Sequence, residues 1–135
     1  MKIKILNFGY YQKPSRKHYN DAGADCYIPE NIIIKPHETE KINLKFGLEI
    51  PDGFAGFIIT RSSNASNGLL VHIPPIDSGY RGPIHAIVTN TTDNPITITK
   101  GDRVGQVVIL PIVICDFEEE LNNDRGSGAF GSTGK

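Results

Sequence analysis

The sequence predicts a single all-β domain of the jelly-roll, sandwich or barrel type. Isoleucine outnumbers leucine by 19 to 7, and β-branched side chains favour strands. The 14 glycines and 9 prolines interrupt the 135 residues at close intervals, which shortens every element. No long segment carries the apolar periodicity of an amphipathic helix. A chain of this length forms one core, so we expect about eight or more short strands around it.

Strands are expected where apolar or β-branched residues lie between turn residues. Residues 1–6 alternate lysine and isoleucine, which is typical of a half-buried strand. The other expected strands are residues 25–28, 32–35, 40–50, 53–60, 84–91, 96–99 and 103–114. The connections Pro51-Asp52-Gly53, Asp93-Asn94-Pro95 and Lys100-Gly101-Asp102 contain residues that favour tight turns. Residues 62–67 are compatible with one short helical turn.

Composition and charge argue against several functions. Lysine and arginine total 14 against 15 acidic residues, so no net positive field attracts nucleic acid or an anionic membrane. The longest apolar stretch, residues 107–115, contains Pro111 and is shorter than the ~20 residues of a membrane-spanning helix. We therefore expect a cytoplasmic protein with no signal peptide, no membrane segment and no direct nucleic-acid binding. Cys26 and Cys115 lack metal-site spacing, and we expect both to be reduced, buried thiols.

The composition changes after residue 115. Residues 116–120 carry four acidic side chains, and residues 125–135 are rich in glycine, serine and threonine. These residues have little apolar surface to bury. We therefore expect a core at residues 1–115 and a mobile C-terminal arm at residues 116–135.

Polar residues interrupt the strand pattern in four internal segments and in the arm. Each segment alone suits a turn or an exposed strand position. In order and spacing, however, they resemble the five motifs of the trimeric dUTP pyrophosphatases (dUTPases). The resemblance runs from about residue 21 to residue 134 and rests on Ala22-Gly-Ala-Asp25, Arg61-Ser-Ser63, Ile76-Asp77-Ser-Gly-Tyr80-Arg-Gly82, Arg103-Val-Gly-Gln106 and Arg125-Gly-Ser-Gly-Ala-Phe130-Gly-Ser-Thr-Gly134.

The resemblance implies a jelly-roll (β-clip-like) fold and hydrolysis of dUTP to dUMP and pyrophosphate. Such a reaction limits uracil incorporation into DNA and supplies dUMP for dTMP synthesis. Asp77 matches the carboxylate that activates the attacking water, a role that suits a general base. Tyr80 matches the aromatic residue that packs against the deoxyribose and leaves no room for a 2′-hydroxyl.

Other substrate contacts follow from the same resemblance. Arg61, Ser62, Ser63 and Gln106 match phosphate-binding positions, and Ile73 and Ile76 lie in the hairpin expected to hold uracil. In this hairpin the sequence departs from the family pattern. The usual Asn-Ala-Pro-Gly stretch is replaced by residues 71–75, where Pro74 and Pro75 have no backbone N–H to donate. Base recognition is therefore expected to use neighbouring main-chain groups or a shifted hairpin.

The resemblance also implies Mg²⁺ and a homotrimer with shared active sites. The metal is expected on the phosphates and its own waters, with Asp25 acting indirectly through a metal-bound water. In the arm, glycines allow close approach to phosphates, and Phe130 can stack over the base. The arm residues expected to contact the substrate are Arg125, Phe130, Gly131, Ser132 and Thr133.

Two alternatives stay open at this stage. A dCTP deaminase shares the fold and the Arg61-Ser62-Ser63 segment, but it needs an arginine soon after the serines, where this chain has Asn64-Ala-Ser66. The second alternative belongs to another class, a binding protein whose regulatory protein partner responds to nucleotide in the same pocket.

Overall fold

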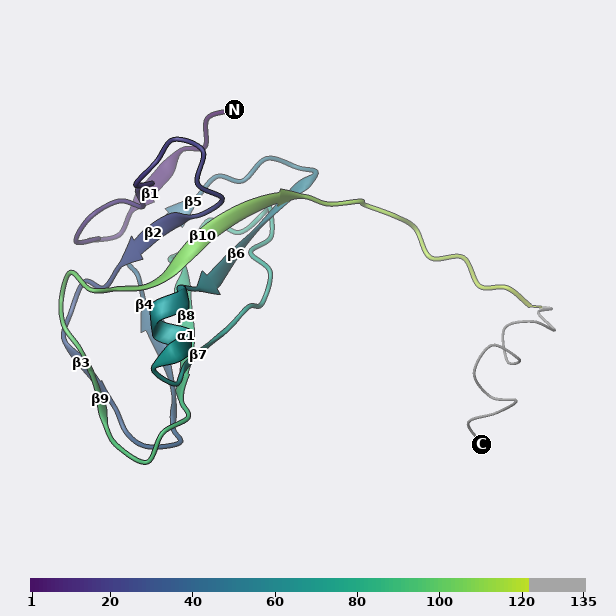
Figure 1. Ribbon diagram of the computed structural model, residues 1–135. Coiled ribbons are helices and arrows are strands. Elements are labelled where there is room, and N and C mark those ends of the chain that lie inside the picture. Colours follow the sequence, from purple (N-terminus) through teal and green to yellow (C-terminus); the bar gives the residue numbers. More distant parts are fainter. Residues whose placement is uncertain (122–135) are drawn as a thin grey trace.

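The computed structural model describes residues 1–121, which form ten strands and one short helix (Figure 1). The elements are β1 (Ile5–Asn7), β2 (Ala24–Tyr27), β3 (Ile32–Ile34), β4 (Thr39–Asn43), β5 (Phe46–Leu48), β6 (Phe54–Thr60), α1 (Ser62–Ser66), β7 (Leu69–His72), β8 (His85–Asn90), β9 (Ile96–Ile98) and β10 (Arg103–Pro111). The prediction of an all-β fold is confirmed.

The strands pair in four small antiparallel sheets. Two sheets have three strands, in the orders β2-β10-β6 and β4-β8-β7, and the pairs β1-β5 and β3-β9 form the other two. Each pair except β7-β8 joins strands that are not consecutive along the chain, so the chain crosses repeatedly between sheets. β10 is central in its sheet and places residues of β2 and β6 side by side.

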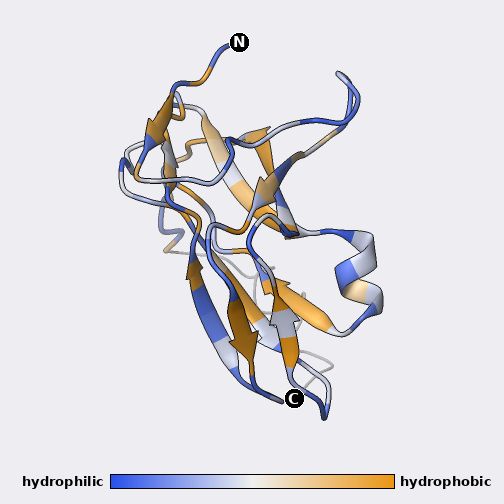
Figure 2. Ribbon diagram, turned by 90° about the vertical axis from the view of Figure 1, so that its left-hand side faces the viewer, coloured by the Kyte–Doolittle hydropathy of each residue, from blue (hydrophilic) through white to orange (hydrophobic). Residues whose placement is uncertain are grey.

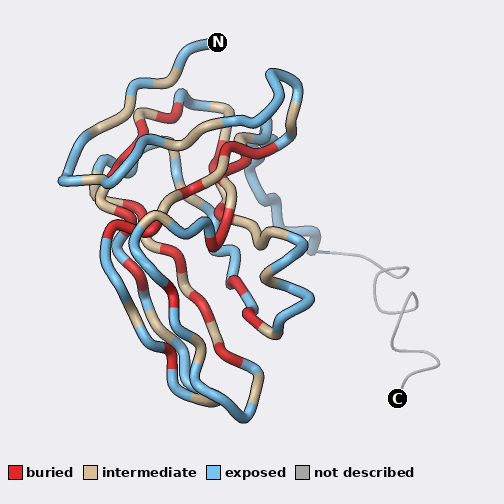
Figure 3. Tube along the Cα trace, turned by 60° about the vertical axis from the view of Figure 1, so that its left-hand side comes forward, coloured by how far each residue is buried: buried red, intermediate tan, exposed pale blue. Residues whose placement is uncertain are grey.

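A single core is shared by these sheets. Alternate residues of the strands point inward, as in β8, where Ala86, Val88 and Asn90 are buried and the residues between them are more exposed. Hydrophobic residues recur along the strands in Figure 2, and buried and exposed positions alternate along the trace in Figure 3. The largest fully buried side chains are Phe46, Ile28, Ile34, Leu44, Ile50, Val88, Asn90 and Cys26.

The strand predicted at residues 40–50 is two strands. Lys45 has φ of 60°, a left-handed conformation that interrupts a strand, and the Asn43 side chain accepts a hydrogen bond from the Lys45 N–H at 2.8 Å. β4 therefore ends at Asn43 and β5 begins at Phe46, and the two strands pair in different sheets. The local hydrogen bond that allows this turn is not evident from hydrophobic pattern.

The end of β10 and the presence of β7 also differ from the prediction. β10 ends at Pro111 and not at residue 114, because Pro111 pairs with Phe54, the first residue of β6. One further backbone hydrogen bond, from the Ile112 N–H to the Gly53 carbonyl at 2.9 Å, closes this end of the pair. β7 was not predicted as a strand, since Leu69–His72 is a short run close to two prolines. Strand β1 is Ile5–Asn7, so it begins four residues later than the expected strand at residues 1–6 and ends one residue after it. The remaining strands and the helical turn lie within one or two residues of their expected ends.

The two cysteines have different environments. Cys26 is fully buried as expected, and burial raises the pKa of its thiol to about 12. The prediction for Cys115 was wrong, because its side chain is exposed after β10 ends. Residues 112–121 run away from the body of the fold (Figure 1). Among the described residues, no helix has the length and apolar character needed to cross a bilayer.

Candidate active site

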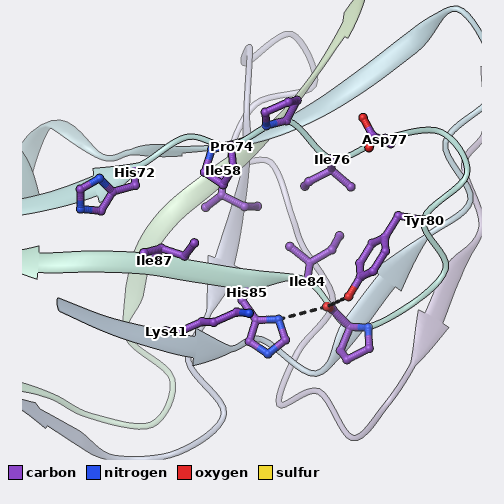
Figure 4. Close-up of a pocket in the computed structure, with 12 residues that line it drawn as sticks. Lys41, Ile58, His72, Pro74, Ile76, Asp77, Tyr80, Ile84, His85 and Ile87 are labelled. Atoms are coloured by element: carbon purple, nitrogen blue, oxygen red, sulfur yellow. Dashed lines mark hydrogen bonds between the residues drawn. The ribbon is translucent and has the colours of Figure 1, made fainter.

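A pocket of about 260 Å³ lies at one end of the outer face of sheet β4-β8-β7 (Figure 4). Part of its wall comes from this sheet, because Lys41, His72, His85 and Ile87 point outward from adjacent strands. The rest comes from Ile58 of β6 and from the connection between β7 and β8. The connecting residues that line the pocket are Pro74, Pro75, Ile76, Asp77, Tyr80, Pro83 and Ile84.

Asp77 is placed by the pairing of its neighbour. Ile76 forms both backbone hydrogen bonds with Gly56 of β6, at 2.7 and 3.0 Å. The Asp77 carbonyl then accepts a hydrogen bond from the Tyr80 N–H at 3.1 Å, which closes a turn. The Asp77 carboxylate is exposed and makes no hydrogen bond or ion pair with any residue from 1 to 121. It is therefore free to accept a proton or a hydrogen bond from a ligand.

Tyr80 is held at the same end of the pocket. Its hydroxyl donates a hydrogen bond to the Pro83 carbonyl at 2.6 Å, and His85 Nδ1 donates to the same carbonyl at 3.2 Å. Gly82 allows this arrangement, since a Cβ there would lie 2.6 Å from the Tyr80 hydroxyl. Figure 4 shows the ring standing beside Asp77 at the mouth of the pocket. A ligand in this pocket would meet both the aromatic ring and the carboxylate.

The wall of the pocket is mainly apolar. Pro74 and Pro75 line it together with Ile58, Ile84 and Ile87. Ile73 is not among the lining residues, and 53 % of its surface is exposed. Because the prolines offer no N–H, polar groups that meet a base here come from other positions.

A second group of predicted residues surrounds Asp25 at the other end of β6. The Asp25 carboxylate is mostly shielded, with 18 % of its side chain exposed. Arg61 Nε lies 3.2 Å from one of its oxygens, and Arg103 Nη1 lies 3.5 Å from the other. Arg61 and Arg103 therefore bring two positive charges to one place, with one carboxylate between them. A site with this excess of positive charge suits an anionic ligand.

Gln106 lies beside this ion-paired group. It pairs with Asp25 across β2 and β10, and its amide donates to the Thr60 carbonyl at 3.3 Å. Gly23 makes room for the Gln106 side chain, because a Cβ on Gly23 would lie 2.4 Å from Gln106 Oε1. Ser62 and Ser63 are exposed at the start of α1, directly after Arg61.

Within a single chain, the pocket lined by Asp77 and the group of residues around Asp25 lie apart. The Asp77 segment is attached to β6 at Gly56, and Arg61 follows five residues later, just past the end of β6. At about 3.3 Å per residue, these positions are roughly 16 Å apart along the strand. No residue of the pocket wall belongs to the Asp25 group in the described part of the chain.

The acidic side chains do not form a preformed metal cage. Within residues 1–121, no group of three or more His, Cys, Asp or Glu side chains is placed to hold a metal ion. Asp25 is the carboxylate nearest to the expected phosphate contacts, and both of its oxygens face arginines. Such a carboxylate is suited to accept hydrogen bonds from metal-bound water, which fits Mg²⁺ because that ion retains its waters.

Several residues of these two groups were not predicted to have a role. Arg103 is expected only as the first residue of a motif. Its position three residues before Gln106, which pairs with Asp25 across β10 and β2, brings its guanidinium to the Asp25 carboxylate. Lys41, His72 and His85 line the pocket because they occupy outward positions on three paired strands. Only the pairing of these strands reveals that they share a face. The predicted arm residues Arg125, Phe130, Gly131, Ser132 and Thr133 lie outside the described residues.

Comparison with known proteins places this all-β chain in a class of nucleotide hydrolases. The family model for dUTPase matches residues 10–134. A deoxyuridine 5′-triphosphate nucleotidohydrolase from Thermobifida fusca is 40 % identical over 128 residues, covering 90 % of this chain and 72 % of the relative. One from Tropheryma whipplei is 38 % identical, covering 100 % of this chain and 97 % of the relative. The chain belongs to the dUTPase family and is a dUTP-hydrolysing enzyme by descent.

Solved structures show the same fold. The dUTPase of Staphylococcus bacteriophage 80alpha, with bound dUPNHPP, has a TM-score of 0.85 at 25 % identity, covering 99 % of each chain. That phage enzyme is described as controlling transfer of virulence genes by a G protein-like mechanism. The dUTPase of phage phi11 of S. aureus, whose structure reveals a structural Mg(II) ion, has a TM-score of 0.85 at 22 % identity, covering 92 % of this chain and 99 % of that one. The jelly-roll prediction is confirmed.

Proposed function

We propose that Asp77 is the general base of dUTP hydrolysis in this protein. Its carboxylate takes a proton from a water molecule whose oxygen attacks the α-phosphorus of dUTP. The bond between the α-phosphorus and the oxygen that bridges to the β-phosphorus breaks, giving dUMP and pyrophosphate. The observation that supports this role is the position of Asp77, which lines the pocket with a carboxylate free of protein partners among residues 1–121. The reaction would lower the dUTP available for incorporation into DNA.

Tyr80 and the apolar wall are proposed to hold the nucleoside. The ring, fixed through Pro83, packs against the deoxyribose and leaves no space for a 2′-hydroxyl. The base then enters the pocket beside Ile76 and the two prolines. Ile73 contributes through its main chain in this proposal, since its side chain is outside the pocket wall.

Arg61, Ser62, Ser63 and Gln106 are proposed to bind the triphosphate. A fixed guanidinium stabilises negative charge as it develops on the phosphates. Asp25 orients Arg61 through the 3.2 Å ion pair and would accept hydrogen bonds from water bound to Mg²⁺. When bound, Mg²⁺ would neutralise part of the triphosphate charge.

We infer that active sites are shared between copies of the chain in a homotrimer. The nucleoside pocket and the Asp25 group are at opposite ends of β6 in one chain, so a neighbouring copy can supply the second group. Residues 112–121 also leave the body of the fold with large apolar side chains exposed, including Val113 at 86 % and Phe117 at 95 %. Such exposure is typical of a surface that another chain covers.

Replacing Asp77 by asparagine tests the proposed base. The Asp77→Asn variant keeps the shape of the side chain but has no basic oxygen, so we expect turnover of dUTP to fall by about 100-fold or more. Pyrophosphate release measures the rate, and nucleotide binding by calorimetry serves as the control for an intact pocket. Near-normal turnover would remove Asp77 from the mechanism.

Mixing two inactive variants tests the shared site. Asp77→Asn and Arg61→Ala subunits are unfolded, combined in equal amounts and refolded together. If each site takes Asp77 and Arg61 from different chains, about a quarter of the sites regain both residues, and activity returns to that level. If both residues act from one chain, no activity returns. Analytical ultracentrifugation reports the number of chains in the assembly.

The arm is proposed to close over bound nucleotide, with Phe130 stacking on the base and Arg125, Gly131, Ser132 and Thr133 contacting the phosphates. Closure excludes water and strengthens the electrostatic interactions of the site. A chain lacking residues 124–135 is expected to keep its thermal stability and lose most of its activity. Unimpaired hydrolysis by this truncated chain would refute the role of the arm.

A further inference from the structure

We propose that Asp52 is a positioning residue for Asp77 and acts through the hydroxyl of Ser78. The inference rests on the proposed role of Asp77 as the base. It follows from how the three residues 76–78 are attached to the rest of the fold. Asp52 lies 25 residues earlier in the sequence, in the turn that precedes β6.

Asp77 is anchored on its N-terminal side by the main chain. Ile76 and Gly56 exchange two backbone hydrogen bonds, the only pairing of this segment with a strand in the described chain. Gly56 suits this crowded position, because a Cβ there would lie 3.0 Å from Ile50 Cδ1 and 3.3 Å from Ile109 Cδ1, both closer than ordinary contact. This anchor fixes the residue before Asp77. The following peptide is restrained from within the same loop, by the 3.1 Å hydrogen bond from the Tyr80 N–H to the Asp77 carbonyl.

Asp77 is anchored on its C-terminal side by a side chain. Ser78 Oγ donates a hydrogen bond to Asp52 Oδ1 at 2.9 Å. The turn that carries Asp52 is closed by a 3.2 Å hydrogen bond from the Phe54 N–H to the Pro51 carbonyl. Both anchors therefore come from one short, ordered stretch, residues 51–56. Together they restrain the peptide planes on both sides of Asp77.

The Asp52 contact also determines where the Ser78 proton points. The Ser78 hydroxyl has a single proton, and donating it to Asp52 keeps it away from the neighbouring Asp77 carboxylate. Arg81 donates to the Ser78 carbonyl, and its guanidinium lies 3.9 Å from Glu49. Within residues 1–121, the Asp77 carboxylate stays without a protein donor and is available to water. Loss of Asp52 would free the hydroxyl to compete for it.

The test compares four variants in dUTP hydrolysis by the full chain. Asp52→Ala and Ser78→Ala each remove the hydrogen bond, and we expect kcat to fall by about fivefold with KM within about twofold. Asp52→Asn keeps an acceptor oxygen, so it should retain most of the wild-type kcat. The double variant Asp52→Ala/Ser78→Ala should be no slower than either single variant, because both substitutions remove the same contact.

Asp93→Ala is the matched control. Like Asp52, Asp93 is an exposed carboxylate with a side-chain hydrogen bond, here with His37 at 2.7 Å. Asp93 is not among the residues that line the pocket. It should leave kcat unchanged. Hydrogen exchange of the amides of residues 76–80 provides a readout independent of catalysis and should rise in Asp52→Ala but not in Asp52→Asn.

Three outcomes would overturn the inference: a wild-type kcat in Asp52→Ala, an equal loss in Asp52→Asn, or losses that multiply in the double variant. Failure of the base itself is distinguishable, because it would show as normal turnover in Asp77→Asn.

Discussion

Replacing Gly23 by alanine should damage phosphate binding through Gln106. The added Cβ would lie 2.4 Å from Gln106 Oε1, 2.8 Å from Cδ and 2.9 Å from Cγ, all closer than the 3.4 Å at which ordinary contact begins. The amide group must move by about 1 Å. The clash involves the end of a flexible side chain, so the backbone pairing of β2 with β10 can remain.

The energetic cost follows from what the amide loses. Its 3.3 Å hydrogen bond to the Thr60 carbonyl contributes about 0.5–1.5 kcal/mol to stability. Losing one phosphate contact of about 1.4 kcal/mol lowers kcat/KM about tenfold. Because Gly23→Ala moves the amide away from both partners, we expect a small fall in the free energy of unfolding and a larger fall in kcat/KM.

Urea denaturation and steady-state pyrophosphate release measure the two effects. The control is Gly23→Ala in a Gln106→Ala background, which lacks all three atoms that the new Cβ would meet. In that background Gly23→Ala should cost nothing further. An equal cost with and without the Gln106 side chain would refute the steric explanation.

Three further predictions concern the core and the pocket. Asn90 is fully buried and makes four side-chain hydrogen bonds, so Asn90→Ala should lower the free energy of unfolding by about 3–5 kcal/mol in urea denaturation. The Cys26 thiol has its ordinary pKa of 9.0 in the unfolded chain, and burial raises that pKa to about 12 in the folded chain. The stabilisation from this group is therefore present below pH 9 and is lost above it, by about 1.4 kcal/mol per pH unit. The stability difference between wild type and Cys26→Ala should therefore shrink from pH 8 to pH 10, and an unchanged difference would contradict the buried thiol. Tyr80→Phe removes the hydrogen bond to Pro83 and should reduce the preference of kcat/KM for dUTP over UTP several-fold.

Much of the fold follows from local chemistry. β-Branched residues in alternation predict β8, and turn residues mark its ends, because both effects act over a few neighbouring residues. The division of residues 40–50 depends on the left-handed Lys45, which a short-range pattern does not reveal. The exposure of Cys115 depends on where β6 begins, about 60 residues earlier, since β10 ends beside the first residue of β6.

The candidate site also has residues that the sequence predicts and contacts that only the structure reveals. Motif order and spacing predict Asp77, Tyr80 and Arg61 as site residues, because a motif is read from residues that are neighbours along the chain. The hydrogen bond of Asp52 and the ion pair of Arg103 depend on which strands and turns are neighbours, which the sequence does not reveal.

The amino-acid order by itself determined the strand-forming segments, the turns and the chemical groups available for phosphate and nucleoside. Only the tertiary structure decided which of those groups meet. β6 holds the Asp77 segment at one end and Arg61 at the other, so a stiff extended strand keeps apart residues that the motifs assign to one reaction. The separation is set by strand geometry and pairing register, which depend on contacts between distant segments of the chain.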